Sequence, residues 1–213
     1  MKNSSILLAL LVLCTSVHAA PRSGIEYFPA ELNLPTIVCQ FGNSEARKFP
    51  ALSSFEDDWY SKHLHAADEP SLFEQSLTPK SNSGNSYRFT WLGTFHAPVM
   101  VRIDENARGQ MFLTAKRLTG KGGYEPGRID KIIQRQLTPA ESARLRRALG
   151  SGDLAQLKPT PCDRGLDGAV WIVEVRTGET YYVVTRWSPQ TGPVRNIGLS
   201  FLILTGWDNR PIY

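Results

Sequence analysis

The spacing of apolar and polar residues changes along the chain, and each change predicts a different element. In residues 87–96 large aromatic residues recur at every second position, while Arg88, Thr90 and His96 fall on the opposite face. This alternation predicts a half-buried β-strand. Similar stretches bounded by turn residues predict further strands at 99–104, 110–119 and 128–137, and a hairpin of 169–176 with 180–187.

Three other stretches have the spacing of helices. Ser53 or Ser54 is a candidate N-cap for a helix that starts near Phe55, with acids in its first turn. Residues 194–205 are apolar nearly all round, which fits a buried helix best, although a core strand fits the same run. A capping box with proline at the first helical position is formed by Thr138, Pro139 and Glu141, and Gly150 ends that helix.

Together these elements predict an α+β fold. We expect a mainly antiparallel sheet of five to seven strands, with three helices packed on it, in a single domain that covers residues 53–213. Residues 20–52 are rich in proline and contain one short apolar stretch around Val38. They predict an irregular N-terminal arm that crosses the domain.

The first nineteen residues predict a signal peptide. Lys2 precedes an apolar run at 6–17, and small residues at positions 17 and 19 indicate cleavage after Ala19. The apolar run is shorter than the ~20 residues that a membrane span needs, and Leu13 is too large for lipoprotein processing at Cys14. We therefore expect a periplasmic or secreted protein that begins at Ala20 and has no transmembrane segment after cleavage.

Cleavage leaves two cysteines, Cys39 and Cys162. In an oxidising compartment they are expected to form a disulfide bond that ties the arm to the domain. Because they are far apart and form no C-x-x-C motif, they indicate a structural bond and disfavour a cysteine nucleophile.

The formal net charge of the whole chain is +4 at pH 7. A mild basic surplus suits anionic partners such as wall polymers or phospholipid surfaces, but lysine and arginine scattered over a solvated face explain it as well. We predict no nucleic-acid partner.

Motifs for covalent catalysis and phosphate binding are missing from the sequence, which has no G-x-S-x-G, no S-x-x-K and no G-x-x-x-x-G-K-[ST]. His63 and His65 would point apart on a helix, so a zinc site would need His96 and a distant carboxylate. We predict no metal and no cofactor. Paired carboxylates stay conceivable as catalytic groups, from the set Glu56, Asp57, Asp58, Glu125 and Glu174.

The predicted hairpin and the glycine-rich loop carry the other candidate residues. Glu174 and Arg186 are expected to form a cross-strand ion pair, and Trp171 and Trp187 are expected in the core or at its rim. Residues 120–127 form the main loop, where an aromatic and a charged side chain suit contact with a partner, namely Tyr124 and Glu125.

Several motifs of the chain are similar to those of an uncharacterised family of exported bacterial proteins. The resemblance extends over about residues 55–205. It is carried by residues 59–64, 69–72, 87–96, 122–127, 165–169 and 186–189, with Trp171 and Glu174. It implies no activity, but it marks loops that could form one surface.

The hypothesis favoured by the sequence is a periplasmic binding protein without catalytic activity, of the inhibitor or immunity type, directed against a cell-wall-degrading enzyme. Its partner would be another envelope or secreted protein, contacted by the loops at 120–127 and 163–168 through Tyr124, Glu125 and Asp167. Two alternatives stay open. One is an envelope hydrolase that uses carboxylates or a histidine and a carboxylate, and the other is a structural envelope protein.

Overall fold

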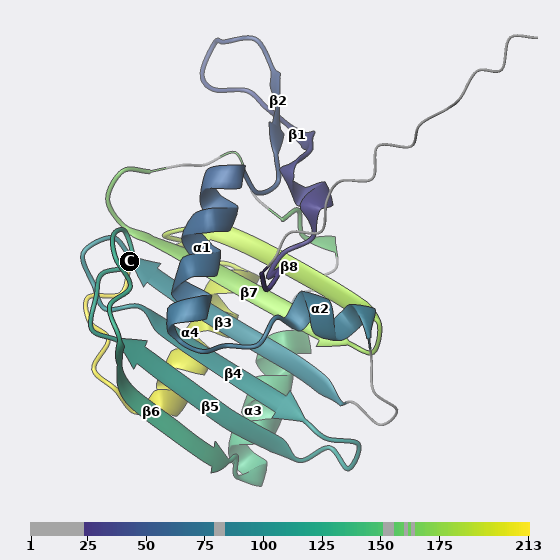
Figure 1. The fold of residues 1–213 in the computed structure, drawn as a ribbon, viewed down its shortest axis with the longest axis vertical. Coiled ribbons are helices and arrows are strands. Elements are labelled where there is room, and N and C mark those ends of the chain that lie inside the picture. Colours follow the sequence, from purple (N-terminus) through teal and green to yellow (C-terminus); the bar gives the residue numbers. More distant parts are fainter. Residues whose placement is uncertain (1–23, 79–83, 151–155, 160–161, 163–164) are drawn as a thin grey trace, which may run out of the picture.

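A six-stranded antiparallel sheet lies at the centre of the described chain (Figure 1). The computed structural model describes residues 24–78, 84–150, 156–159, 162 and 165–213, so the predicted signal peptide lies outside the described residues. The order of the strands is β6-β5-β4-β3-β7-β8. Their bounds are β3 Asn85–Gly93, β4 Val99–Glu105, β5 Met111–Leu118, β6 Ile129–Gln136, β7 Ala169–Thr177 and β8 Thr180–Trp187.

Helices cover both faces of this sheet (Figure 1). α3 (Pro139–Gly150) and α4 (Pro193–Thr205) pack on one face, and α1 (Ser54–Ala66) and α2 (Leu72–Leu77) lie on the other. The predicted α+β class with a mainly antiparallel sheet is confirmed. α2 is a fourth helix beyond the three predicted, because six residues are too few for a helical period to show in the sequence.

The predicted helix starts are confirmed by their caps. The Ser53 hydroxyl accepts a hydrogen bond from the Glu56 amide at 3.3 Å, and the Glu56 carboxylate accepts one from the Ser53 amide at 2.8 Å. Thr138 and Glu141 form the predicted capping box in the same way, at 3.2 and 2.8 Å. Residues 194–205, whose sequence was compatible with either a helix or a core strand, belong to the helix α4.

β3 is buried on both faces, so the prediction of a half-buried strand is wrong. Phe89 and Trp91 belong to the core beneath α4, while Leu92 packs with residues of α1 on the other face. The polar positions Arg88 and Thr90 are fully buried as well. Their burial follows from the place of β3 between β4 and β7, under the segment that joins α1 to α2.

The N-terminal arm contains a hairpin that projects from the domain, so the prediction of an irregular arm is wrong there (Figure 1). After the short 3-10 helix Ala30–Asn33, β1 (Pro35–Cys39) pairs antiparallel with β2 (Arg47–Pro50). These strands are short, and prolines at their outer ends obscured them in the sequence.

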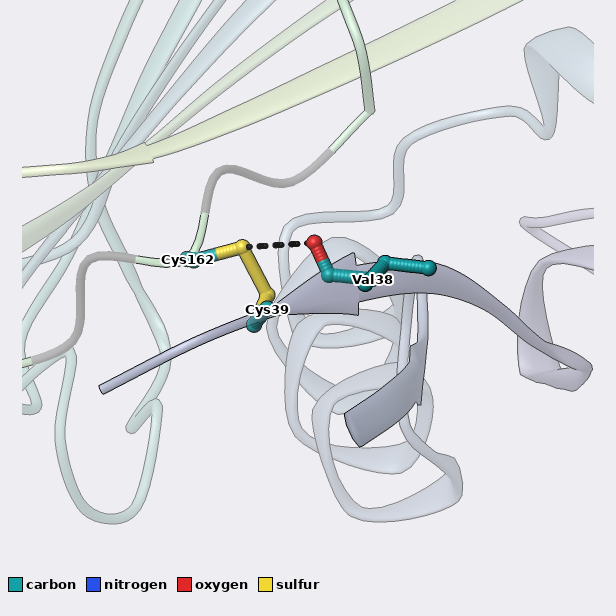
Figure 2. The surroundings of a disulfide bond; sticks show 3 residues. All are labelled: Val38, Cys39 and Cys162. Atoms are coloured by element: carbon teal, nitrogen blue, oxygen red, sulfur yellow. Dashed lines mark hydrogen bonds between the residues drawn. A yellow bond between two sulfur atoms is a disulfide. The ribbon is translucent and has the colours of Figure 1, made fainter. Parts of the chain in front are cut away.

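The predicted disulfide between Cys39 and Cys162 is present (Figure 2). The two Cα atoms are 5.4 Å apart, and the Cys162 Sγ lies 3.5 Å from the Val38 carbonyl oxygen. The bond therefore fixes the end of β1 to the segment that precedes β7. Among the described residues, no helix combines the length and the apolar composition that crossing a membrane requires.

Candidate functional site

Residues 120–127 join β5 to β6 and form a turn held by its own backbone, which we name the Tyr124 loop. The Lys121 amide donates to the Glu125 carbonyl at 3.0 Å, and the Tyr124 amide donates to the Lys121 carbonyl at 3.0 Å. Gly127 has a φ of +72°, a conformation that favours glycine. The backbone conformation of the tip is therefore fixed by contacts within the loop.

The Tyr124 loop is also fixed to the turn that follows β3. The Gly122 amide donates to the His96 carbonyl at 2.9 Å, and the Gly123 amide donates to the Thr94 carbonyl at 3.1 Å. A Cβ on Gly122 would lie 2.6 Å from the Leu92 backbone, so only glycine permits this approach.

α1 holds the other side of the Tyr124 loop. The Trp59 indole N–H donates to the Gly122 carbonyl at 2.6 Å, and the Lys62 ammonium lies 3.2 Å from the Glu125 carboxylate. The Glu125 side chain is still 88% exposed, and Tyr124 is 54% exposed. Both sequence-predicted residues are thus presented to solvent from a rigid support.

Asp167 lies on a segment that meets the same turn. The Thr94 amide donates to the Gly168 carbonyl at 2.8 Å, so the backbone of Thr94 links this segment to the Tyr124 loop. Asp167 is exposed, and its neighbour Leu166 is 93% exposed. Residues 163 and 164 of the predicted contact loop lie outside the described residues.

Large apolar side chains are exposed around this end of the sheet. Phe95 packs beside Tyr124 with ring centroids 6.1 Å apart, and Phe55 packs beside Trp59 at 6.0 Å. Sequence reasoning missed Phe95 and Phe55, because it placed both in regular elements as core residues. We name as the loop-end surface the exposed residues Phe55, Phe95, Tyr124, Glu125, Leu166 and Asp167.

The three histidines that the structure describes, His63, His65 and His96, lie in different surroundings. His63 is buried, with Nδ1 2.8 Å from the Trp59 carbonyl, whereas His65 on the same helix is exposed, as the helical spacing predicted. The His96 ring packs between Trp91 and Tyr213, at 5.8 and 5.3 Å. Among the residues that the structure describes, no three potential metal ligands lie together.

His63 is expected to make the protein less stable as the pH falls below about 6.5. Burial lowers the pKa of His63 from 6.5 in the folded state, so below that pH the unfolded chain binds a proton more readily. The stability that depends on neutral His63 is therefore complete above pH 6.5 and is lost as the pH falls below that value. Urea unfolding from pH 7.5 to 5.5 should show this slope, which H63N should flatten and the exposed control H65N should retain. An unchanged slope in H63N would refute the assignment.

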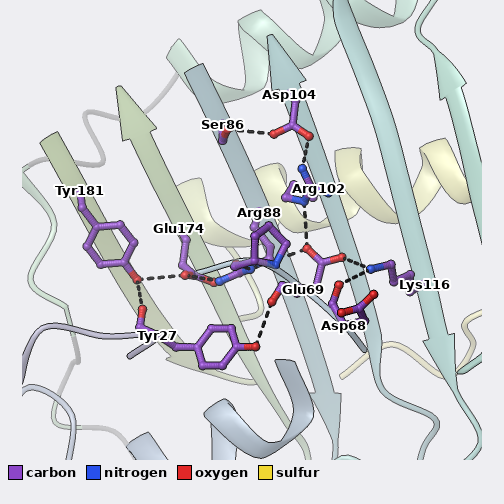
Figure 3. Close-up of polar contacts among 11 residues, drawn as sticks. Tyr27, Asp68, Glu69, Ser86, Arg88, Arg102, Asp104, Lys116, Glu174 and Tyr181 are labelled. Carbon is purple, nitrogen blue, oxygen red and sulfur yellow. Dashed lines mark hydrogen bonds and ion pairs between the residues drawn. The ribbon is translucent and has the colours of Figure 1, made fainter. Parts of the chain in front are cut away.

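The predicted ion pair between Glu174 and Arg186 is wrong. The hairpin register places Glu174 opposite Val183 and Arg186 opposite Trp171. Arg186 instead donates to the Lys158 carbonyl at 3.1 Å. Glu174 pairs across the other edge of β7 with Arg88 of β3, whose Nε and Nη2 each donate to its carboxylate at 2.6 Å (Figure 3).

Arg88 and Glu174 belong to a charge network buried beneath the segment between α1 and α2 (Figure 3). The second acid is Glu69, which contacts Arg102 at 3.0 Å and Lys116 at 2.9 Å and lies 3.6 Å from Arg88. We name as the buried charge network Glu69, Arg88, Arg102, Lys116 and Glu174. No local sequence pattern predicts this network, because its members come from four strands and one loop.

Two tyrosines close this network. The Tyr181 hydroxyl donates to the Glu174 carboxylate and the Tyr27 hydroxyl donates to the Glu69 carbonyl, both at 2.9 Å. Burial raises the pKa of Tyr27 to about 12 and that of Tyr181 well above its usual value, and nearby Glu174 adds to the latter shift. Burial alone would lower the pKa of Arg88, but the Glu174 carboxylate raises it, so Arg88 stays charged.

Two more carboxylates of the set proposed from sequence also have partners, whereas Asp58 is exposed. Glu56 caps α1, and Asp57 accepts a hydrogen bond from Ser61 at 3.1 Å. Trp171 lies in the core beneath α4, and Trp187 is partly buried against the core cluster on the other face of the sheet, as expected.

Comparison of the sequence with known protein families found no match, and a search of curated proteins also found none.

Proposed function

We propose that the protein is a periplasmic or secreted binding protein without catalytic activity, and that it inhibits, or gives immunity against, a cell-wall-degrading enzyme. Its contact region is the loop-end surface. The partner is another envelope or secreted protein, and the interaction uses no cofactor.

The observation that carries this proposal is the order of the Tyr124 loop. Backbone hydrogen bonds to Thr94 and His96 and an indole bond from Trp59 hold the loop, while the side chains at its tip stay exposed. A loop that is already rigid loses little conformational entropy on binding, and tyrosine is among the residues that contribute most energy to interfaces. This is the arrangement expected for an inhibitor that presents a fixed loop to a cleft.

The location supports the same class of partner. The N-terminal segment has the pattern of an export signal, and the disulfide between Cys39 and Cys162 suits an oxidising compartment. Enzymes that degrade the cell wall act in that compartment.

The contacts of the acidic residues favour binding over a hydrolase. Glu174 is bonded to Arg88, Glu56 to the start of α1, and Glu125 lies beside Lys62. The first two carboxylates are therefore neutralised or capped, and the third lies on an exposed loop tip.

Replacing Tyr124 by alanine is expected to weaken binding to the partner at least ~10-fold, since a central interface tyrosine typically contributes more than 1.4 kcal/mol. The immobilised mature protein would be incubated with envelope extract, and retained proteins would be identified and then titrated. Tyr182→Ala is the matched control, because Tyr182 is another exposed tyrosine, on β8.

The proposal predicts that the native protein and Y182A retain a wall-degrading enzyme and slow its clearing of purified peptidoglycan, while Y124A does neither. Equal retention by Y124A and Y182A would contradict the placement of the site. A retained enzyme whose activity is unchanged would contradict the inhibitory role.

A further inference from the structure

A second candidate site lies on the α2 side of the domain, apart from the loop-end surface. It is a pocket of about 540 Å³, a size typical of small-molecule sites. α2, the segment before it, the start of the described chain and β7 form its walls. The residues that line it are Ile25, Pro70, Ser71, Glu74, Gln75, Thr78 and Arg176.

Arg176 supplies a positive charge to this pocket from a buried position. Arg176 is only 5% exposed. Nη2 donates to the Gly84 carbonyl at 2.7 Å and to the Ser86 hydroxyl at 3.0 Å, which fixes the plane of the guanidinium. A guanidinium held in one orientation is suited to recognising a carboxylate.

Another of the lining residues, Glu74, is a hydrogen-bond acceptor. The Glu74 carboxylate accepts a hydrogen bond from the Glu26 amide at 2.7 Å, and the Ser71 hydroxyl donates to the Glu26 carbonyl at 2.5 Å. These two bonds fix the wall to α2. An ionised carboxylate has room for several hydrogen bonds, so Glu74 can accept a further N–H from a ligand. Ile25 and Pro70 add apolar surface to the lining.

We propose that this pocket binds an α-amido carboxylate, the group found at the carboxyl end of a peptide. The ligand carboxylate faces Arg176, its amide N–H faces Glu74, and a small apolar side chain contacts Ile25. Glu74 would repel a simple anion, which is why a donor next to the carboxylate is part of the proposal. Protein carboxyl termini and wall stem peptides that end in D-alanine share this chemistry. The site is independent of the loop-end surface and of the proposed inhibition.

Calorimetric titration of the mature protein with N-acetyl-alanyl-alanine tests the proposal. The probes are the L,L and D,D forms, each with its C-terminal amide as the control ligand. At least one acid should bind, and its amide should bind at least ~10-fold more weakly, because the amide lacks the charge that Arg176 recognises. A preference for the D,D form would assign the site to wall peptides, and a preference for the L,L form to protein termini.

Substitutions at exposed positions test the pocket without disturbing the buried residues that hold the fold together. Ile25→Trp, at a position that is 54% exposed, should fill the pocket and reduce acid binding at least ~10-fold. The control Ile203→Trp makes the same change at an exposed position beside a different pocket, on α4, and should bind like the native protein. Equal affinity for acid and amide, binding unaffected by I25W, or no binding of either acid would each overturn the proposal.

Discussion

Replacing Arg88 by methionine is expected to lower the free energy of unfolding by about 3–5 kcal/mol, the range seen when one partner of a buried ion pair is removed. Arg88 and Glu174 are both fully buried, and their carboxylate and guanidinium form two hydrogen bonds of 2.6 Å. Without Arg88, the negative charge of Glu174 would stay buried with no paired cation. The Pro70 carbonyl would also lose the hydrogen bond that it accepts from Arg88 at 2.6 Å. Urea unfolding followed by tryptophan fluorescence measures the loss.

The control for this variant is Arg210→Met. Arg210 also pairs with an acid, Asp208, at 2.9 Å, but both side chains are largely exposed. An exposed pair contributes little to stability, so the urea midpoint of R210M should match that of the native protein. A midpoint for R88M equal to that of R210M would show that the buried charge network does not stabilise the fold.

Removing the disulfide is expected to lower the free energy of unfolding by up to about 4–5 kcal/mol. The bond joins residues separated by 123 positions, so it restricts the unfolded chain strongly. The double variant Cys39→Ser with Cys162→Ser should unfold at a lower urea concentration than the native protein. Adding a reducing agent should move the native protein to the midpoint of the variant and leave the variant unchanged. A native midpoint that reduction does not alter would contradict the stabilising role.

Local patterns in the sequence predicted most elements, because their causes are local. The turn residues that precede β5 and the capping box of Thr138 and Glu141 depend on residues close together in the chain. The disulfide could be predicted as well, since the predicted signal cleavage would leave only Cys39 and Cys162 to pair. The projecting hairpin escaped prediction because its strands have five and four residues, too few to show alternation.

The contacts of Glu174 and those that hold the Tyr124 loop depend instead on residues far apart in the sequence. Glu174 was assigned to Arg186 because both lie on one hairpin, but Thr177 pairs with Thr180, and that register excludes the contact. Glu174 instead pairs with Arg88, which lies on β3 and is 86 residues from Glu174 in the sequence. Likewise, Tyr124 and Glu125 were identified from their loop, but the support from Trp59 depends on how α1 packs, which no local pattern reports.

The central claim, that the Tyr124 loop contacts a wall-degrading enzyme, is tested most directly by photo-crosslinking in living cells. A photoreactive phenylalanine derivative would replace Tyr124 in one strain and the exposed Tyr182 in another. Crosslinked products would be isolated from the envelope and identified by mass spectrometry. The claim predicts a crosslink from position 124 to an enzyme that degrades the cell wall, and none to that enzyme from position 182. No crosslink from position 124, or the same products from both positions, would contradict it.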